Sequence, residues 1–204
     1  KYFGDARLKD ALTNVFIPSY EIERRMPFFF RSQAAQIYPN YDFPMKLVAR
    51  ATSAAPTYFE PAKVQAHGTA GYYAFVDGGL FANNPAVCAL VESRQAVAGT
   101  EQIFLSLGTG SLTRPIPYDQ ARHWGVARWA KPVLDMAFDG VSATVDYQMR
   151  QLLHGRYLRL QPTLDPSGVE MDNASPGNIR RLKLLAENAV GCTYEKSAGV
   201  FETA

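Results

Sequence analysis

The sequence contains little cysteine, and its two thiols stand apart from other possible metal ligands. Cys88 and Cys192 are the only cysteines in 204 residues, and neither has a second Cys or a His nearby at ligand spacing. Such isolated thiols exclude a disulfide framework and a zinc site of the usual spacing. We interpret Cys88, which lies in an apolar stretch, as a buried free thiol, and we expect no metal or other cofactor.

The sequence also has no excess of one charge and no long hydrophobic run. Its net charge is +2, and no run of Lys or Arg forms a basic stripe, which argues against nucleic-acid binding. No segment reaches the roughly 18 unbroken apolar residues expected of a membrane span. No signal peptide is visible, but residue 1 is Lys, and we expect the natural N-terminus to lie further upstream.

What is present is the composition of an ordinary soluble globular domain. The sequence is 47% hydrophobic and 20% charged, and 204 residues suffice for one sizeable core. Periodicity and turn residues predict short strands that alternate with helices, an arrangement that favours an α/β layered domain. The predicted strands are 15–17, 27–30, 62–65, 72–76, 103–107 and 157–160, and the predicted helices are 5–14, 44–55, one from Pro85, 126–137, 141–153 and 176–190.

Three of these segments carry specific expectations about burial. The predicted helix 5–14 places Leu8, Ala11 and Leu12 on one face. The three adjacent rings of residues 28–30 cannot all face one side of a strand, so we expect that strand to be covered on both faces. The continuous apolar run 103–107 is typical of a buried strand.

Asp77 is placed where α/β folds position reactive groups, at the end of a strand just before the chain turns toward a helix. Gly78 and Gly79 follow it. Because glycine needs no room for a Cβ, the chain can turn sharply there and leave the carboxylate at the sheet edge. Taken alone, Asp-Gly-Gly is typical of an ordinary structural turn. A catalytic interpretation therefore needs support from the surrounding sequence.

The surrounding sequence resembles the patatin-like phospholipase family at five places, in the family's order. Residues 77–85, Asp-Gly-Gly-Leu-Phe-Ala-Asn-Asn-Pro, resemble the family's second catalytic motif, and residues 52–59, Thr-Ser-Ala-Ala-Pro-Thr-Tyr-Phe, resemble its helix-to-strand segment. The segments 17–22, Ile-Pro-Ser-Tyr-Glu-Ile, 106–110, Ser-Leu-Gly-Thr-Gly, and 171–175, Met-Asp-Asn-Ala-Ser, are also similar to patatins. The resemblance thus covers nearly the whole chain.

The resemblance implies a fold, an activity and a site. The fold would be α/β, a layered patatin-like fold with a central sheet flanked by helices, and residues 1–204 would be the C-terminal part of a single patatin-like domain whose N-terminal part is missing. The activity would be that of a serine-type carboxylic ester hydrolase of the phospholipase A type, which cleaves fatty acyl esters of lipids and touches a membrane surface transiently. Asp77 would be the proton acceptor of a Ser-Asp dyad, supported by Gly78 and Gly79.

The serine of that dyad does not occur in the sequence. The family carries it in a Gly-x-Ser-x-Gly elbow, which precedes the aspartate together with a glycine-rich oxyanion loop. The nearest approach, at residues 140–144, lacks the closing glycine and follows Asp77, so we interpret Ser142 as an ordinary helix residue. Residues 108–110 lack the Lys of a nucleotide-binding loop and read as a structural turn. We therefore expect the chain to be inactive alone and to need the upstream segment as its partner.

Histidines and tryptophans offer weaker signals. His67, His123 and His154 lie in no recognisable catalytic motif, and His154 is most simply a favourable charge at a helix C-terminus. Residues 122–131 mix both tryptophans with Arg and Lys, as suits a membrane–water interface. We favour the alternative interpretation for that stretch, a partly buried helix with snorkelling side chains.

Two alternative functions differ from a hydrolase. The first is a patatin fold that never had a serine and serves as a regulatory or partner-binding module. The second is a nucleotide-binding α/β domain, against which the lack of a phosphate loop argues. We favour the truncated hydrolase over the first, because the chain begins with Lys at the edge of a predicted helix and not with Met.

Overall fold

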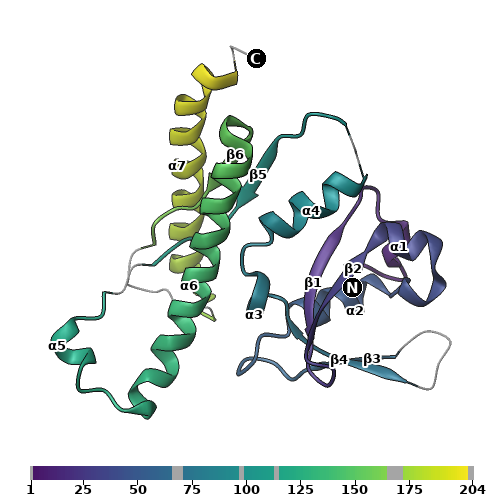
Figure 1. Cartoon of the computed structure of the whole chain (residues 1–204), viewed down its shortest axis with the longest axis horizontal. Coiled ribbons are helices and arrows are strands. Elements are labelled where there is room, and N and C mark those ends of the chain that lie inside the picture. Colours follow the sequence, from purple (N-terminus) through teal and green to yellow (C-terminus); the bar gives the residue numbers. More distant parts are fainter. Residues whose placement is uncertain (1, 66–70, 97–98, 113–114, 165–171, 202–204) are drawn as a thin grey trace. The chain divides into compact units, whose positions relative to one another are not determined.

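The computed structural model describes residues 2–65, 71–96, 99–112, 115–164 and 172–201, without the side chains of residues 95–96 and 192–201. The chain divides into two compact units. The first comprises Lys1–Ala98 and Leu134–Val145, and the second comprises Gly99–Val133 and Asp146–Ala204. The long helix α6 (Val126–Leu153), green in Figure 1, contributes residues to both.

Four strands of the first unit form an antiparallel sheet in the order β2-β1-β4-β3 (Figure 1). Strand β1 pairs with β2 along its whole length and with β4 through its last three residues. The strands are β1 (Phe16–Glu21), β2 (Met26–Arg31), β3 (Ala62–Gln65) and β4 (Tyr72–Asp77). The unit's helices are η1 (Leu8–Asp10), α1 (Ser32–Ile37), η2 (Pro39–Tyr41), α2 (Met45–Thr52), α3 (Gly79–Ala82) and α4 (Ala86–Ala96).

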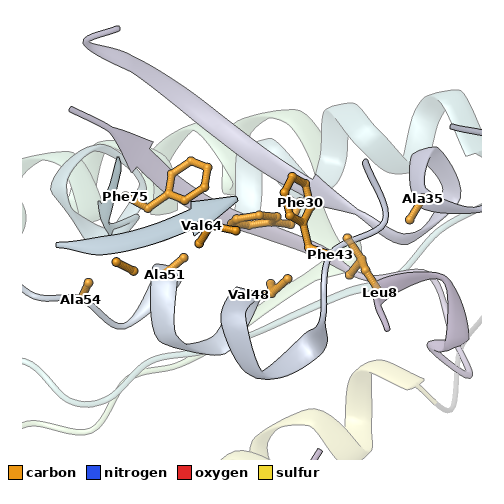
Figure 2. Packing of buried hydrophobic residues seen from close by; sticks show 10 residues of the cluster. Leu8, Phe30, Ala35, Phe43, Val48, Ala51, Ala54, Val64 and Phe75 are labelled. Carbon is orange, nitrogen blue, oxygen red and sulfur yellow. The ribbon is translucent and has the colours of Figure 1, made fainter. Parts of the chain in front are cut away.

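Aromatic rings form the centre of the first unit's core, where the sheet meets α2 (Figure 2). Phe30 lies edge-on to Phe43 and Phe75, with ring centroids 5.2 and 5.1 Å apart. Val48 and Ala51 of α2 are fully buried in the same cluster. Burial of one such ring stabilises the fold by roughly 2–3 kcal/mol, so this cluster fixes α2 against the sheet.

The prediction that the strand over residues 28–30 is covered on both faces is confirmed. Phe28 and Phe30 face the core cluster, with centroids 4.9 Å apart. Phe29 points to the other face, where it stacks on Phe16 at 4.7 Å and meets Phe81 edge-on at 5.8 Å. The second contact ties β2 to α3, directly after the Asp-Gly-Gly turn.

The predicted helix over residues 5–14 is wrong. A single 3₁₀ turn, η1, takes its place; Leu8 is fully buried and Leu12 fully exposed. The carboxylate of Asp10 accepts a hydrogen bond from the backbone N–H of Arg7 at 2.8 Å and closes the turn. The side chain of Arg7 is bound by Asp42, 35 residues away, and this long-range contact outweighs the local periodicity.

Asp42 is a buried carboxylate that anchors this N-terminal segment. Its Oδ2 accepts a hydrogen bond from Nε of Arg7 at 2.6 Å, and its Oδ1 accepts one from the backbone N–H of Lys9 at 3.2 Å. The Lys9 ammonium lies 3.4 Å from Oδ2. Burial would raise the pKa of Asp42, but the hydrogen bonds and charge of Arg7 and Lys9 outweigh burial and hold the pKa below its ordinary 3.8.

The lowered pKa of Asp42 predicts that stability depends on pH. A carboxyl whose pKa is lower in the folded than in the unfolded state stabilises the fold fully above its unfolded pKa, and this contribution is lost as the pH falls through the folded value. We expect Asp42→Asn to lower the free energy of unfolding by about 2 kcal/mol at pH 7, and by clearly less below about pH 4. Urea unfolding at pH 7 and pH 3 tests this; an equal loss at both would contradict it.

The second unit contains a two-stranded parallel sheet of β5 (Phe104–Leu107) and β6 (Tyr157–Leu160). Its other elements are α5 (Tyr118–Ala121), η3 (His154–Arg156) and α7 (Pro176–Phe201), and α7 contacts β6. The predicted helix start at Ser175 and Pro176 is confirmed: Oγ of Ser175 accepts a hydrogen bond from the backbone N–H of Asn178 at 3.3 Å.

The prediction that residues 103–107 form a buried strand is wrong in its burial. The strand exists as β5, but Leu105 and Leu107 are 60% and 69% exposed. Within the described residues β5 pairs only with β6, so one of its edges has no strand beside it. A continuous apolar run indicates which side chains a strand could bury on its two faces. It does not indicate how many strands or helices cover those faces.

The fold class implied by the resemblance is confirmed: the chain is mixed α/β, with a central sheet flanked by helices. The assignment of residues 1–204 to one part of a single domain stays a prediction. None of the helices in the described ranges combines the length and apolarity needed to cross a bilayer.

Candidate active site

Asp77 is the last residue of β4, and the chain turns into α3 two residues later. The sequence prediction of its place at a strand end is confirmed; its catalytic role stays a prediction. Its backbone N–H donates to the carbonyl oxygen of Ala54 at 3.0 Å, and across the sheet it lies opposite Ser19 of β1. Asp77 therefore contacts both of the upstream segments that resemble the family, residues 17–22 and 52–59.

Among the described residues, hydrogen bonds hold the carboxylate of Asp77 at one of its two oxygens. Its Oδ1 accepts a hydrogen bond from the backbone N–H of Gly79 at 2.7 Å, which is an Asx turn. Within the described part of the chain, Oδ2 accepts no hydrogen bond, and the residue is partly exposed. A carboxylate fixed in this way keeps an oriented lone pair that can accept a proton from an incoming group.

Gly78 is required by a close approach of two backbones. A Cβ built on Gly78 would overlap the carbonyl oxygen of Pro18 on β1. The hydroxyl of Thr52, at the end of α2, donates to that same carbonyl oxygen at 2.6 Å. The Pro18 carbonyl is therefore the point where β1, the end of α2 and the Asp-Gly-Gly turn meet, and only glycine leaves room for it.

Ser19 also supports this junction, and it is not a free nucleophile. It is fully buried, and its Oγ lies 2.8 Å from the carbonyl oxygen of Val76 and 3.3 Å from that of Ala51. It thereby joins α2 to the residue that precedes Asp77. The segment 17–22 stands out in the sequence, but nothing local reveals the role of Ser19, because its partners are 32 and 57 residues away.

Glu21, the last residue of β1, is a buried carboxylate whose surroundings differ from those of Asp77. Both of its oxygens are occupied, by the backbone N–H groups of Ala74 at 3.0 Å and Arg24 at 2.6 Å. Burial would raise the pKa of Glu21, but these hydrogen bonds and the Arg24 charge outweigh burial and lower the pKa below its ordinary value. Glu21 is thus a structural anion, both of whose oxygens already accept backbone hydrogen bonds.

Asn84 lies two residues before α4 and caps its start, as the sequence predicts. Its Oδ1 accepts a hydrogen bond from the backbone N–H of Ala86 at 3.3 Å, and its Nδ2 donates to the carbonyl oxygen of Ser142 at 3.3 Å. The asparagine is buried, so the second hydrogen bond joins α4 to the part of α6 that belongs to the first unit. Ser142 lies inside α6, as expected of an ordinary helix residue.

The remaining predicted positions lie elsewhere in the chain. The turn predicted at residues 108–110 is only a bend at Thr109, with Gly110 at φ +105°. The chain continues beside the segment after β6, because the backbone N–H groups of Gly108 and Ser111 donate to the carbonyl oxygens of Leu160 and Pro162 at 2.9 Å. His123 accepts a hydrogen bond at Nε2 from Arg122, and His154 ends α6 as predicted, with φ +49°. His67 and Met171 lie outside the described residues.

The free thiol of Cys88 is only partly buried, and burial raises its pKa. The Cys192 side chain lies outside the described part of the chain. Among the described residues, no three His, Cys, Asp or Glu side chains gather as a metal site would require.

Comparison with known proteins places these observations in a family. Residues 1–90 match the family model of patatin-like phospholipases, a range that contains all three segments around Asp77. Over 91% of its length the chain is 34% identical to patatin-like protein 6 of Arabidopsis thaliana, and over 92% it is 32% identical to patatin-like protein 1 of Oryza sativa subsp. indica. The chain spans about half the length of these relatives or less, 40% and 53% respectively.

Proposed function

This chain belongs to the patatin-like phospholipase family, and from that premise we propose that the whole protein is a lipid acyl hydrolase in which Asp77 is the proton acceptor of a Ser-Asp dyad. Its substrates are fatty acyl esters of phospholipids and other lipids. Residues 1–204 form the C-terminal part of its catalytic domain. The serine belongs to a Gly-x-Ser-x-Gly elbow, which the 204 residues do not contain, so the chain alone is inactive.

The proposed reaction needs a base because a serine hydroxyl is a weak nucleophile. As the serine Oγ attacks the ester carbonyl carbon, its proton passes to Oδ2 of Asp77. The tetrahedral intermediate then expels the alcohol, which takes up that proton, and leaves an acyl-serine. Water hydrolyses the acyl-serine in a second cycle, with Asp77 again accepting and returning the proton. Backbone N–H groups of the oxyanion loop would stabilise the negative oxygen.

One observation carries the assignment of the base to Asp77. Its carboxylate is oriented through Oδ1 by Gly79, while Oδ2 accepts no hydrogen bond from the described residues. Glu21 offers no comparable oxygen, because backbone N–H groups occupy both. Asp77 also lies within the family's matched range, at the end of a strand.

The proposal predicts a difference in covalent labelling between the whole protein and this chain. A fluorophosphonate probe reacts with an activated serine, so we expect it to label the whole protein stoichiometrically and to leave the 204-residue chain unlabelled. Gel fluorescence and intact mass measure both. Heat-denatured whole protein is the control for non-specific reaction, and labelling of the folded chain above that background would overturn the proposal.

A further inference from the structure

The segment from α5 to the start of α6, residues 118–133, has more exposed apolar surface than the sequence suggests. We name it the α5–α6 elbow; all of it belongs to the second unit. A partly buried helix was expected here, but Tyr118 is 77% exposed and Val126 is 90% exposed. The elbow also contains Trp124 and Trp129, which are the chain's two tryptophans.

Two exposed apolar side chains of the elbow, Val126 and Val133, and the half-buried Trp129 share one face of α6. Val126, Trp129 and Val133 follow each other at spacings of three and four residues, which places them along one side of a helix. Val133 is 50% exposed. The Trp129 ring meets the Trp124 ring edge-on, with centroids 5.2 Å apart, so the loop before the helix extends the same apolar surface.

The polar face of the same helical turns is cationic. Arg128 and Lys131 lie away from the apolar stripe and are exposed. Neither forms an ion pair with any described residue. The elbow's Asp119 lies 3.9 Å from Arg122 and so already faces a cation of its own. Two positive charges therefore remain for a negatively charged partner.

We propose that the α5–α6 elbow docks the protein on an anionic lipid surface. A helix that presents Trp and aliphatic residues on one face and Lys or Arg on the other has the pattern of helices that lie in a membrane interface. Indole rings favour that interface, and long cationic side chains extend to the headgroups. A lipid surface fits better than a folded partner, because the unpaired cations match a continuous negative surface. The inference rests on the proposed function, since a lipid hydrolase must reach aggregated substrate.

The two tryptophans make the docking measurable without an added label, because both lie in the elbow. Vesicles of 30% phosphatidylglycerol in phosphatidylcholine are titrated into the 204-residue chain. We expect the emission maximum to shift to the blue by several nanometres, and bromine-labelled lipid to quench it. Pure phosphatidylcholine vesicles should give a clearly smaller response, because they carry no net charge.

Two variants separate the charge from the apolar contact. Arg128→Glu with Lys131→Glu should weaken binding to anionic vesicles at least about tenfold, since each cation near such a surface contributes roughly fivefold. The matched control is Lys46→Glu with Lys183→Glu, which changes the net charge by the same amount at two exposed positions outside the elbow. This control should bind like the wild type. Val126→Asp should also reduce binding and lipid quenching, and its 90% exposure leaves folding little affected.

The outcomes distinguish docking from catalysis, because no step of the measurement needs hydrolysis. Absence of a shift in the folded chain, checked by circular dichroism, would overturn the docking proposal and leave the hydrolase proposal intact. An equal loss in the control pair would show that net charge alone drives binding, and would also overturn it. So would a spectral change without vesicles that tracks protein concentration, because the elbow would then be a contact between copies of the chain.

Discussion

Asp77→Asn in the whole protein should lower kcat for hydrolysis of short p-nitrophenyl esters by about two to four orders of magnitude. The substitution keeps the oxygen that accepts the hydrogen bond from Gly79, so the turn after β4 should persist. What it removes is the oxygen that accepts the serine proton. Initial rates at substrate concentrations on both sides of KM measure the loss, which should fall on kcat and leave KM little changed.

The control for this variant removes the charge of an exposed aspartate on another element. Asp139, exposed on α6, serves this purpose, and Asp139→Asn should retain activity close to that of the wild type. Thermal unfolding of both variants checks that the fold is kept. Near-normal activity in Asp77→Asn would mean that the proton acceptor is another group.

Gly78→Ala should lower the free energy of unfolding by about 2–3 kcal/mol. The added methyl group overlaps the carbonyl oxygen of Pro18, so β1 and the turn must separate. This shift also disturbs the hydrogen bond from Thr52 to the same oxygen. Urea unfolding followed by circular dichroism measures the change, and the whole protein should lose activity in parallel, because the turn orients Asp77.

Gly140→Ala is the matched control for this substitution. Gly140 lies inside α6, and a Cβ there meets no described atom within 4 Å. Because alanine favours a helix more than glycine does, this variant should gain about 0.5–1 kcal/mol. If Gly78→Ala lowers the free energy of unfolding and Gly140→Ala raises it, the backbone contact with Pro18 is the cause of the loss at Gly78. A Gly78→Ala variant as stable as the wild type would disprove the close approach.

The sequence predicts well those features that are decided locally. Turn and capping residues place the end of β4 at Asp77, the start of α4 after Asn84, and the start of α7 at Ser175 and Pro176. Each depends on hydrogen bonds within a few residues. The sequence does not reveal the short helix α3. This helix has only four residues, and it begins within the Asp-Gly-Gly segment, which is typical of a turn.

Features that depend on distant partners are not predictable from one sequence. The segment 5–14 has helical periodicity, but the pairing of Arg7 with Asp42 leaves a single 3₁₀ turn. The role of Ser19 depends on carbonyl groups of two other elements. The strand order β2-β1-β4-β3 cannot be derived from periodicity, which shows that strands exist but not which strands pair.

The Asx turn at Asp77 joins groups only two residues apart. A loop this short costs almost no chain entropy to close, so the carboxylate should acquire its orientation as soon as β4 pairs with β1. The base would then be rigid before any substrate arrives, and the reaction would not need to freeze its rotation during proton transfer. In the whole protein, variation in catalytic rate should therefore follow how firmly the serine is positioned, with the aspartate as the fixed reference point.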